Sequence, residues 1–292
     1  MAYILSADIG GTKLATALFN SEQKIVQRQE LPSEKNDGEQ LFIQLIESFF
    51  LLCEEQQIEI NEIEGVAVGL PGLLNIQEGI VLFQNNLPWR DFPLVRRLQE
   101  FFPQAKIFME KDVDMAAIGE YAVRQYKEET FIYATLSTGI SCSTIVQNRI
   151  IHGAGMAGEI GFTLTGKELS LEQFVAGPAL EHRAREAFGD TRELKDYMED
   201  YYYNHPKMQV IIDDAMEQLA KALFQLFIVF DPHTIVLGGG IFNHHPLLIE
   251  KVKGRLKTLF VHPLLAGKES RVEGSINKGE AGLVGAASRV TM

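Results

Sequence analysis

Glycine-containing polar turns follow two of the apolar runs in the chain, and such turns can bind phosphate. The run Tyr3–Ala7 leads directly into Asp8-Ile9-Gly10-Gly11-Thr12-Lys13, and the run Phe131–Leu136 leads into Ser137-Thr138-Gly139. Glycine lets backbone N–H groups approach an anion closely, and successive amides in such a turn form a concave surface of positive potential. A single turn of this kind is usually an ordinary corner. Because the pattern occurs in both halves of the chain, we interpret the two turns as a pair that holds a polyphosphate.

Two further runs end in the same way. The run 65–70 is closed by Pro71-Gly72, and the run 234–237 is closed by Gly238-Gly239-Gly240. The chain contains no G-x-x-x-x-G-K-[S/T] pattern, and no G-x-G-x-x-G directly follows one of the predicted strands, so neither of these two nucleotide-binding loops is expected. A nucleotide site in this protein must therefore be of another kind.

The elements that position these turns follow from hydrophobic periodicity. Short runs rich in Val, Ile and Leu alternate with longer amphipathic segments, and this alternation is typical of an α/β fold. A length of 292 residues corresponds to roughly two compact domains. The predicted strands are 3–7, 65–70, 131–136 and 234–237, and the predicted helices are 39–57, 113–127, 173–187, 209–230 and 279–290.

Composition excludes several classes of protein. The formal net charge of −12 would repel a phosphodiester backbone, so nucleic acid is not an expected partner. The longest apolar stretch, Leu219 to Phe230, is interrupted by Lys221 and Gln225 and is shorter than the ~20 residues that span a bilayer. The first apolar run lacks the basic start and the length of a signal peptide, which predicts a cytoplasmic protein. Cys53 and Cys142 have no partner at metal-ligand spacing, so neither a disulfide framework nor a four-sulfur zinc site is expected.

Several motifs, in order along the chain, resemble those of the ROK family of bacterial sugar kinases and related repressors, within the actin-like ATPase superfamily. The likeness extends from Asp8 to about Gly285. The family's D-x-G-G-T-K hairpin stands as Asp8-Ile9-Gly10-Gly11-Thr12-Lys13, and its G-x-P-G as Gly69-Leu70-Pro71-Gly72. The remaining matches are Asn86-Leu87-Pro88-Trp89 for N-L-x-W, Ala157 through Phe162 for A-G-E-x-G-H, and Val236 through Ile241 for V-L-G-G-G-I.

This resemblance implies an α/β fold of two actin-like (ribonuclease H-like) lobes with a cleft between them. The N-terminal lobe would cover 1–115, completed by a C-terminal helix at 276–292, and the C-terminal lobe would cover 116–275. Family repressors carry a DNA-binding segment ahead of the phosphate hairpin, whereas Asp8 is the eighth residue here, which favours a kinase-type member. The implied cofactors are ATP and Mg²⁺, the implied partners are a small sugar and ATP, and the implied assembly is a homodimer.

The resemblance also implies a role for individual residues. Asp112, in Glu110-Lys111-Asp112-Val113-Asp114, matches the family's catalytic base, although a carboxylate there could instead be only a helix N-cap. Asp8 would orient Mg²⁺ through water, and Lys13 would meet either phosphate or solvent. Phosphate or adenosine contacts would come from Gly10, Gly11, Thr12, Thr138, Gly139, Gly238, Gly239 and Gly240. Sugar contacts would come from Gly72, Asn86, Lys111, Glu159, Phe162 and Glu172.

The family's zinc cluster, C-x-C-G-x-x-G-C-x-E, has no counterpart, since no cysteine lies between Phe162 and Glu172. The family histidine that binds zinc and sugar is replaced by Phe162, whose ring has no nitrogen to bind either, so no zinc is expected. Some family members without zinc, among them certain N-acetylmannosamine kinases, carry an aromatic residue at this position. An apolar ring suits a sugar with an acetyl or aryl group better than glucose, because a hydroxyl facing a phenyl ring is left unpaired.

Two other departures keep a second interpretation open. Lys111 replaces a sugar-binding asparagine, and its ammonium can donate to a sugar, a phosphate or Asp112, but cannot accept. Ser141-Cys142-Ser143 replaces glycines expected in the phosphate turn, where a Cβ could push the backbone away from phosphate. The leading hypothesis is an ATP- and Mg²⁺-dependent hexose kinase, of glucokinase or N-acetylmannosamine kinase type, that phosphorylates the C6 hydroxyl. The alternative is a sugar-binding sensor or regulatory protein of the same fold with weak catalysis.

Overall fold

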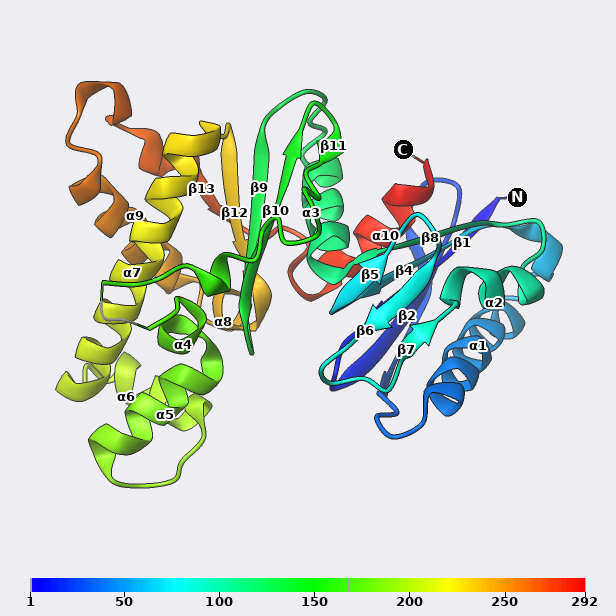
Figure 1. The fold of residues 1–292 in the computed structure, drawn as a ribbon, viewed down its shortest axis with the longest axis horizontal. Coiled ribbons are helices and arrows are strands. Elements are labelled where there is room, and N and C mark those ends of the chain that lie inside the picture. Colours follow the sequence, from blue (N-terminus) through cyan, green and yellow to red (C-terminus); the bar gives the residue numbers. More distant parts are fainter. Residues whose placement is uncertain (1, 167–168, 292) are drawn as a thin grey trace. The chain divides into compact units, whose positions relative to one another are not determined.

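The computed structural model describes residues 2–166 and 169–291. Its chain forms two compact units, Met1–Tyr126 with Glu280–Met292, and Lys127–Gly279 (Figure 1). The predicted boundary between 115 and 116 lies inside helix α3 (Asp112–Val123). The whole of α3 belongs to the first unit because it packs against the C-terminal helix α10 (Ala281–Thr291), and the unit therefore continues to Tyr126.

The first unit is built on a five-stranded sheet. Its order is β3-β2-β1-β4-β8, and a three-stranded sheet of order β5-β6-β7 accompanies it; the strands are β1 (Tyr3–Ile9), β2 (Lys13–Phe19), β3 (Ile25–Pro32), β4 (Ile63–Leu70), β5 (Leu73–Asn75), β6 (Ile80–Phe83), β7 (Arg90–Phe92) and β8 (Lys106–Lys111). β1 runs antiparallel to β2 and parallel to β4, and β4 runs parallel to β8. The carboxyl ends of β1, β4 and β8 therefore lie along one edge of the sheet.

Helices cover both faces of this sheet. Alternate side chains of β1 point to opposite faces, as the period of two requires. Leu5 packs in a core with helices α1 (Gly38–Glu55) and α2 (Leu94–Phe101), whereas Ile4 packs with Leu283 of α10. The indole of Trp89 closes the first core, since it is buried, stacks on Phe92 and donates to the Gly38 carbonyl at 2.8 Å.

Two glycines allow α3 and α10 to meet backbone to backbone. A Cβ on Gly285 would lie 1.5 Å from the Met115 carbonyl oxygen, and a Cβ on Gly119 would lie 2.5 Å from the Ala281 carbonyl oxygen. Real Cβ atoms do not approach other atoms this closely. The position of α10 on the first unit thus depends on the absence of side chains at this crossing.

The second unit repeats part of this topology. Its sheet has the order β11-β10-β9-β12-β13, with strands β9 (Phe131–Leu136), β10 (Ile140–Val146), β11 (Arg149–Ile150), β12 (Thr234–Gly238) and β13 (Val272–Gly274). β9 runs antiparallel to β10 and parallel to β12, as β1 does to β2 and β4. The two predicted polar turns are therefore equivalent hairpin turns, one in each unit.

The helices of the second unit surround a core in which α7 is central. They are α4 (Glu172–Val175), α5 (Gly177–Phe188), α6 (Leu194–Tyr202), α7 (Pro206–Phe230), α8 (Gly239–His244) and α9 (Leu247–Leu259). The predicted helix 173–187 is divided into α4 and α5 because Ala176 adopts an extended backbone ahead of Pro178. Leu219, Leu223 and Phe227 of α7 are buried in the core of the unit.

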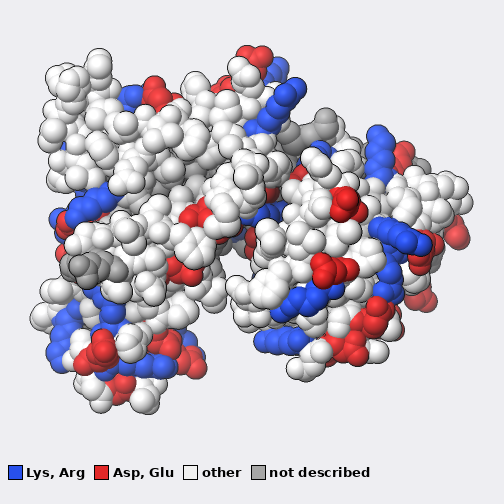
Figure 2. Space-filling model, in the orientation of Figure 1, with Lys and Arg blue, Asp and Glu red and all other residues white. Residues whose placement is uncertain are grey.

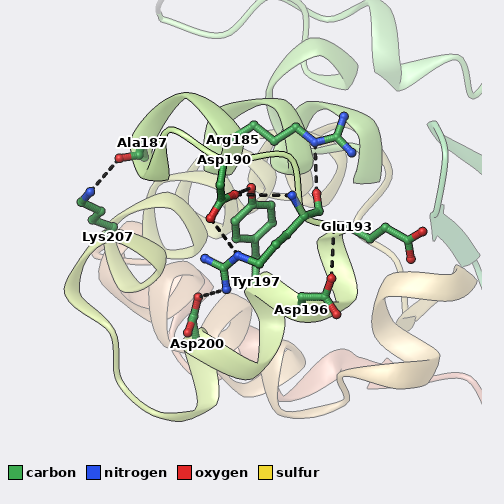
Figure 3. Close-up of polar contacts among 9 residues, drawn as sticks. Arg185, Ala187, Asp190, Glu193, Asp196, Tyr197, Asp200 and Lys207 are labelled. Atoms are coloured by element: carbon green, nitrogen blue, oxygen red, sulfur yellow. Dashed lines mark hydrogen bonds and ion pairs between the residues drawn. The ribbon is translucent and has the colours of Figure 1, made fainter.

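The corner between α5 and α6 is held by a polar network (Figure 3). Arg192 donates to Asp190 at 2.9 Å and to Asp200 at 2.7 Å, and Tyr197 donates its hydroxyl to Asp190. The Arg192 guanidinium also lies over the rings of Phe188 and Tyr197, 4.9 and 4.5 Å from their centroids. These contacts fix the loop that begins at Gly189, whose positive φ of 74° ends α5.

Charged side chains of both signs are mixed on the surface. Figure 2 shows Lys and Arg beside Asp and Glu where α5 and α6 lie, rather than a continuous basic patch on that face. Within the described residues, no helix is long and apolar enough to cross a membrane. The apolar stretch Leu219 to Phe230 forms the C-terminal part of α7.

Candidate functional site

Two carboxylates meet at the carboxyl ends of the parallel strands in the first unit. Asp8 is paired with Gly69 of β4, and Gly69 is paired with Glu110 of β8, two residues before Asp112. A Cβ on Gly69 would lie 3.5 Å from the Asp112 Cα. The absence of a side chain at Gly69 thus lets the first turn of α3, which carries Asp112 and Met115, pack closely against β4 beside Asp8.

The two aspartates influence each other electrostatically. Burial and the nearby Asp112 carboxylate raise the pKa of Asp8 to about 7, against a smaller opposite effect of Lys13. Asp112 is the first residue of α3, and its Oδ1 accepts from the Val113 N–H at 2.7 Å. The N-cap residue of α3 is Lys111, so the interpretation of Asp112 as an N-cap is wrong. A carboxylate in the first helical turn is stabilised in its charged form by the helix dipole.

The predicted phosphate-binding turn of the first unit, Gly10–Thr12, is a tight hairpin between β1 and β2 and is called the phosphate turn of that unit. The Gly10 N–H donates to the Lys13 carbonyl at 2.8 Å. Ser33 supports the turn from the end of β3: its hydroxyl donates to the Gly10 carbonyl at 2.7 Å and its N–H to the Thr12 carbonyl at 3.2 Å. Sequence reasoning missed Ser33 because no motif links it to a turn more than twenty positions earlier.

Lys13 turns away from the turn toward β3 in this structure. Its ammonium lies 3.1 Å from Glu30 Oε2, and both side chains are about half exposed. Exposed pairs of this kind contribute ~0–1 kcal/mol, so little free energy holds Lys13 in this position. A phosphate at the turn could therefore compete with Glu30 for the ammonium.

Asn86 and Gly72, both predicted sugar contacts, lie in the same unit. A Cβ on Gly11 would lie 2.7 Å from the Asn86 Cβ, so Asn86 packs directly against the phosphate turn. Gly72 has a φ of +99°, and a Cβ there would lie 2.3 Å from the Phe83 carbonyl oxygen. Only glycine fits this conformation and this space. The structure thus brings Asn86 to the phosphate turn of the first unit.

One contact of Asp8 comes from the far end of the sequence. A Cβ on Gly282, in the first turn of α10, would lie 2.7 Å from Asp8 Oδ2. Gly282 therefore lets α10 cover the Asp8 carboxylate. Gly282 and Gly285 are three residues apart, a spacing typical of helix–helix contacts. The sequence alone therefore does not indicate that Gly282 contacts Asp8.

In the second unit, three glycine-containing segments meet. The β9–β10 turn is closed by the Ser137 N–H, which donates to the Gly139 carbonyl at 2.8 Å, and the Gly177 N–H donates to the Ser137 carbonyl at 2.8 Å. Gly239 has a φ of +84°, and a Cβ there would lie 2.5 Å from the Leu136 carbonyl oxygen. The structure therefore brings the Thr138-Gly139 turn together with the Gly238–Gly240 segment, which sequence reasoning had linked only by resemblance.

The predicted sugar-binding carboxylates of this unit lie near the same turn. Glu172 is the first residue of α4, and its Oε2 accepts from the Ile140 N–H at 3.1 Å. Glu159 is half-buried and precedes the 3₁₀ helix Ile160–Phe162. The side chain of Phe162 at the end of that helix is exposed. Glu172 thus contacts the phosphate turn itself, which the sequence did not predict.

The chain matches the ROK family model over residues 4–291. It belongs to the ROK family. A glucokinase from Halalkalibacterium halodurans is 24% identical over 312 residues, covering 97% of this chain and 93% of that protein. An N-acetyl-D-glucosamine kinase from Yersinia pseudotuberculosis is 25% identical over 302 residues, covering 96% of each.

Solved ROK structures share the fold. A ROK hexokinase from Thermus thermophilus matches with a TM-score of 0.82 and 28% identity, covering 98% of this chain and 97% of that one. A ROK family glucokinase from Streptomyces griseus, in complex with glucose and AMPPNP, matches with a TM-score of 0.80 and 23% identity over 99% of each chain. The predicted α/β fold of two actin-like units is thereby confirmed.

The structure places two of the departures from the ROK motifs in strands. Ser141, Cys142 and Ser143 lie within β10, after the turn, and Cys142 and Ser143 are buried. The expectation that their Cβ atoms disturb the phosphate turn is therefore wrong, since the turn itself is Ser137–Gly139 and keeps its glycine. Lys111 ends β8 and is half-buried, directly beside Asp112.

The third departure concerns the segment that corresponds to the ROK zinc cluster. Here the chain forms a short hairpin, in which the Leu171 N–H donates to the Thr163 carbonyl at 2.7 Å and the Thr165 N–H to the Leu169 carbonyl at 2.8 Å. Residues 167 and 168 lie outside the described residues. Backbone hydrogen bonds thus close this loop in the part that the structure describes.

Proposed function

We propose that this ROK protein is an ATP-dependent kinase that transfers the γ-phosphoryl group of ATP to a hexose hydroxyl, at C6. The observation that carries the proposal is the meeting of Asp8 and Asp112 at one edge of a sheet, with the Gly10–Thr12 turn following β1 directly. Phosphoryl transfer needs this combination of a base and phosphate donors. The relatives named glucokinase and N-acetyl-D-glucosamine kinase support the same class.

Asp112 is the proposed catalytic base. Its carboxylate accepts the proton of the attacking hydroxyl, the sugar oxygen forms a bond to the γ-phosphorus, and the bond from that phosphorus to the β–γ bridging oxygen of ATP breaks to release ADP. The Gly10–Thr12 turn, through the backbone N–H groups of Gly11 and Thr12, neutralises charge on the phosphates together with Lys13. The Thr138-Gly139 turn is a second phosphate contact, and Gly238, Gly239 and Gly240 lie against the adenosine.

The donor set of the first unit fits a magnesium ion. Asp8 supplies carboxylate oxygens, the ligands that Mg²⁺ prefers, and the repulsion between Asp8 and Asp112, seen in the raised pKa of Asp8, is the kind that a nearby divalent cation relieves. When bound with ATP, Mg²⁺ supplies charge neutralisation at the β- and γ-phosphates. Asp8 would hold this ion through water.

The proposed sugar contacts are Gly72 and Asn86 in the first unit, Lys111 beside the base, and Glu159, Phe162 and Glu172 in the second unit. Phe162 offers an apolar ring where a zinc-binding histidine stands in related proteins, and backbone hydrogen bonds close the loop that follows it. We therefore propose a zinc-free site that favours an N-acetylated sugar, such as N-acetylmannosamine or N-acetylglucosamine, over glucose. We further propose a cytoplasmic homodimer that does not bind nucleic acid, in line with the net charge of −12.

The test is an ADP-release assay with ATP and Mg²⁺ against glucose, mannose, fructose, N-acetylmannosamine, N-acetylglucosamine and β-glucosides. We expect turnover on at least one sugar and a loss of ~10²–10⁴-fold in Asp112→Ala, the range of a missing general base, with unchanged sugar affinity. Retained turnover in Asp112→Ala would refute the assignment of the base. A higher kcat/KM for glucose than for every N-acetylated or β-glycosylated sugar would refute the proposed preference.

One observation supports a second candidate function. Lys111 directly precedes Asp112 as the N-cap residue of α3, and an ion pair between its ammonium and the base would compete with the role of Asp112 as proton acceptor. A sugar-binding sensor with weak catalysis would have this property. The sensor would be favoured if no sugar in the panel gave turnover while one of them raised the melting temperature. Lys111→Asn would then be expected to restore turnover.

A further inference from the structure

The carboxylate of Glu172 lies between two segments of the second unit that have different predicted ligands. Its Oε2 accepts from the Ile140 N–H at 3.1 Å, at the end of the phosphate turn. A Cβ on Gly139 would lie 2.6 Å from the same oxygen, and a Cβ on Gly161 would lie 3.2 Å from it. Gly161 belongs to the segment that carries Glu159 and Phe162. One side chain therefore contacts both the phosphate turn and the sugar segment.

The sugar segment is itself attached to the strand that follows the turn. The Cys142 N–H donates to the Gly158 carbonyl at 2.8 Å, and a Cβ on Gly161 would lie 2.8 Å from the Ile140 carbonyl oxygen. This close packing leaves little room for independent movement of the two segments. A change at the Glu172 carboxylate should therefore affect both the phosphate turn and the sugar segment.

The charge of Glu172 opposes phosphate binding at this turn. The side chain of Glu172 is exposed at this place. A negative charge in contact with Gly139 repels a phosphate bound by the turn, and it also occupies the Ile140 N–H, which is adjacent to the amides that would bind that phosphate. In the free protein, Glu172 should therefore weaken nucleotide binding.

A sugar hydroxyl that donates to the same carboxylate changes this balance. Hydrogen bonds to an ionised acceptor are short and strong, so a donating sugar hydroxyl would hold the carboxylate toward the sugar and away from the phosphate. We propose that Glu172 couples the two substrates: without sugar its charge disfavours the nucleotide phosphate at the β9–β10 turn, and with sugar bound this repulsion is relieved. The inference rests on the proposed kinase function and adds to it an ordered preference, in which sugar binding promotes nucleotide binding and limits futile hydrolysis of ATP.

The experiment measures the coupling directly by calorimetric titration of Mg²⁺ and AMPPNP, with and without saturating N-acetylglucosamine or glucose. In the wild-type protein we expect the sugar to lower the Kd of AMPPNP by about 10-fold. In Glu172→Gln, whose amide oxygen still accepts from the Ile140 N–H, AMPPNP should bind more tightly without sugar. The same sugar should then change its Kd by less than about 2-fold.

Glu159→Gln is the matched control. It removes a carboxylate from the sugar segment but leaves unchanged the carboxylate of Glu172, which contacts Gly139. It should weaken sugar binding but keep the wild-type coupling factor once the sugar is saturating. An unchanged coupling factor in Glu172→Gln, or weaker AMPPNP binding without sugar, would overturn the inference while the kinase function stands. A wild-type protein that binds neither AMPPNP nor any sugar would overturn the proposed function itself.

Discussion

The folded protein disfavours the ionised form of Asp8, and the proposed function of this residue explains why. Burial and the Asp112 carboxylate both favour its protonated form, and together they raise its pKa to about 7. Most carboxyl groups in proteins are arranged so that ionisation is favoured on folding. The opposite arrangement at Asp8 is typical of functional sites, where a bound cation restores the balance.

This arrangement predicts an unusual dependence of stability on pH. The pKa of Asp8 is about 7 in the folded protein and about 4 in the unfolded chain, so the folded state binds the extra proton between these values. Its contribution to the free energy of unfolding should thus fall as pH rises from about 4 to about 7, by at most ~1.4 kcal/mol per pH unit. Urea unfolding between pH 5 and pH 8 should show this slope in the wild-type protein and a shallower slope in Asp8→Asn. Equal slopes in the two proteins would contradict the prediction, and Glu22→Gln, at an exposed site, serves as the control.

Phe162 is the residue at which substrate preference can be tested. Its side chain is 72% exposed, so Phe162→His should leave the fold intact. A ring nitrogen can bond a sugar hydroxyl, which a phenyl ring leaves unpaired, and the ratio of kcat/KM for glucose over N-acetylglucosamine should therefore rise by about 10-fold or more. Leu164→Ala, at a neighbouring exposed side chain, should leave the ratio unchanged. If Phe162→His left this ratio unchanged, Phe162 would not determine the preference between the two sugars.

At the scale of elements, the four strands that the sequence predicted are buried along most of their length, whereas β2, which is buried after Lys13, was missed. β1, β4, β9 and β12 read as continuous apolar runs because they are flanked by other strands and covered by helices. β3 and β10 were not predicted, since polar side chains interrupt their apolar pattern.

The same reasoning explains what the sequence revealed of the candidate site. The two phosphate turns were predicted from the sequence because each joins neighbouring strands and carries its own glycines. Ser33 and Gly282 were missed because they reach the first turn and Asp8 from distant segments. Contacts of this kind are created only when the sheet and α10 have assembled.

The contact between α3 and α10 makes a strong prediction about stability. In Gly285→Ala the new methyl group would lie 1.5 Å from the Met115 carbonyl oxygen, and backbone atoms cannot move aside as a flexible side chain could. We expect a loss of about 3 kcal/mol or more in the free energy of unfolding, measured with urea and circular dichroism.

Gly254 in α9 provides a matched control for this change. A Cβ there has no neighbour within 4 Å, so Gly254→Ala should instead stabilise the protein by ~0.5–1 kcal/mol through its higher helix propensity. If both substitutions changed stability equally, close packing of α10 would not be the cause.

At the scale of the whole molecule, the first unit is discontinuous in sequence and the second is continuous. Removal of residues 280–292 should expose Ile4, Ala17 and Phe19 on the face that α10 covers, while the core of Lys127–Gly279 stays complete. The protein has one tryptophan, Trp89, which is buried in the first unit and reports on that unit alone.

For the truncated chain we expect red-shifted tryptophan fluorescence, with fast amide hydrogen exchange in the first unit and slow exchange in the second. Removal of residues 291 and 292 alone should change neither signal. A truncated chain with the wild-type fluorescence spectrum and slow exchange in β1 would show that the first unit does not need α10.

The position of α10 has a consequence for synthesis on the ribosome. Residues 2–126 emerge first, yet one face of their sheet stays uncovered until residues 280–291 leave the exit tunnel. At ~5–20 residues per second, the intervening segment takes roughly 8–30 seconds to translate. The second unit can fold in that interval, whereas the nascent first unit must wait with Ile4, Ala17 and Phe19 exposed. This exposed face is where a chaperone such as a ribosome-associated holdase would be expected to bind the growing chain.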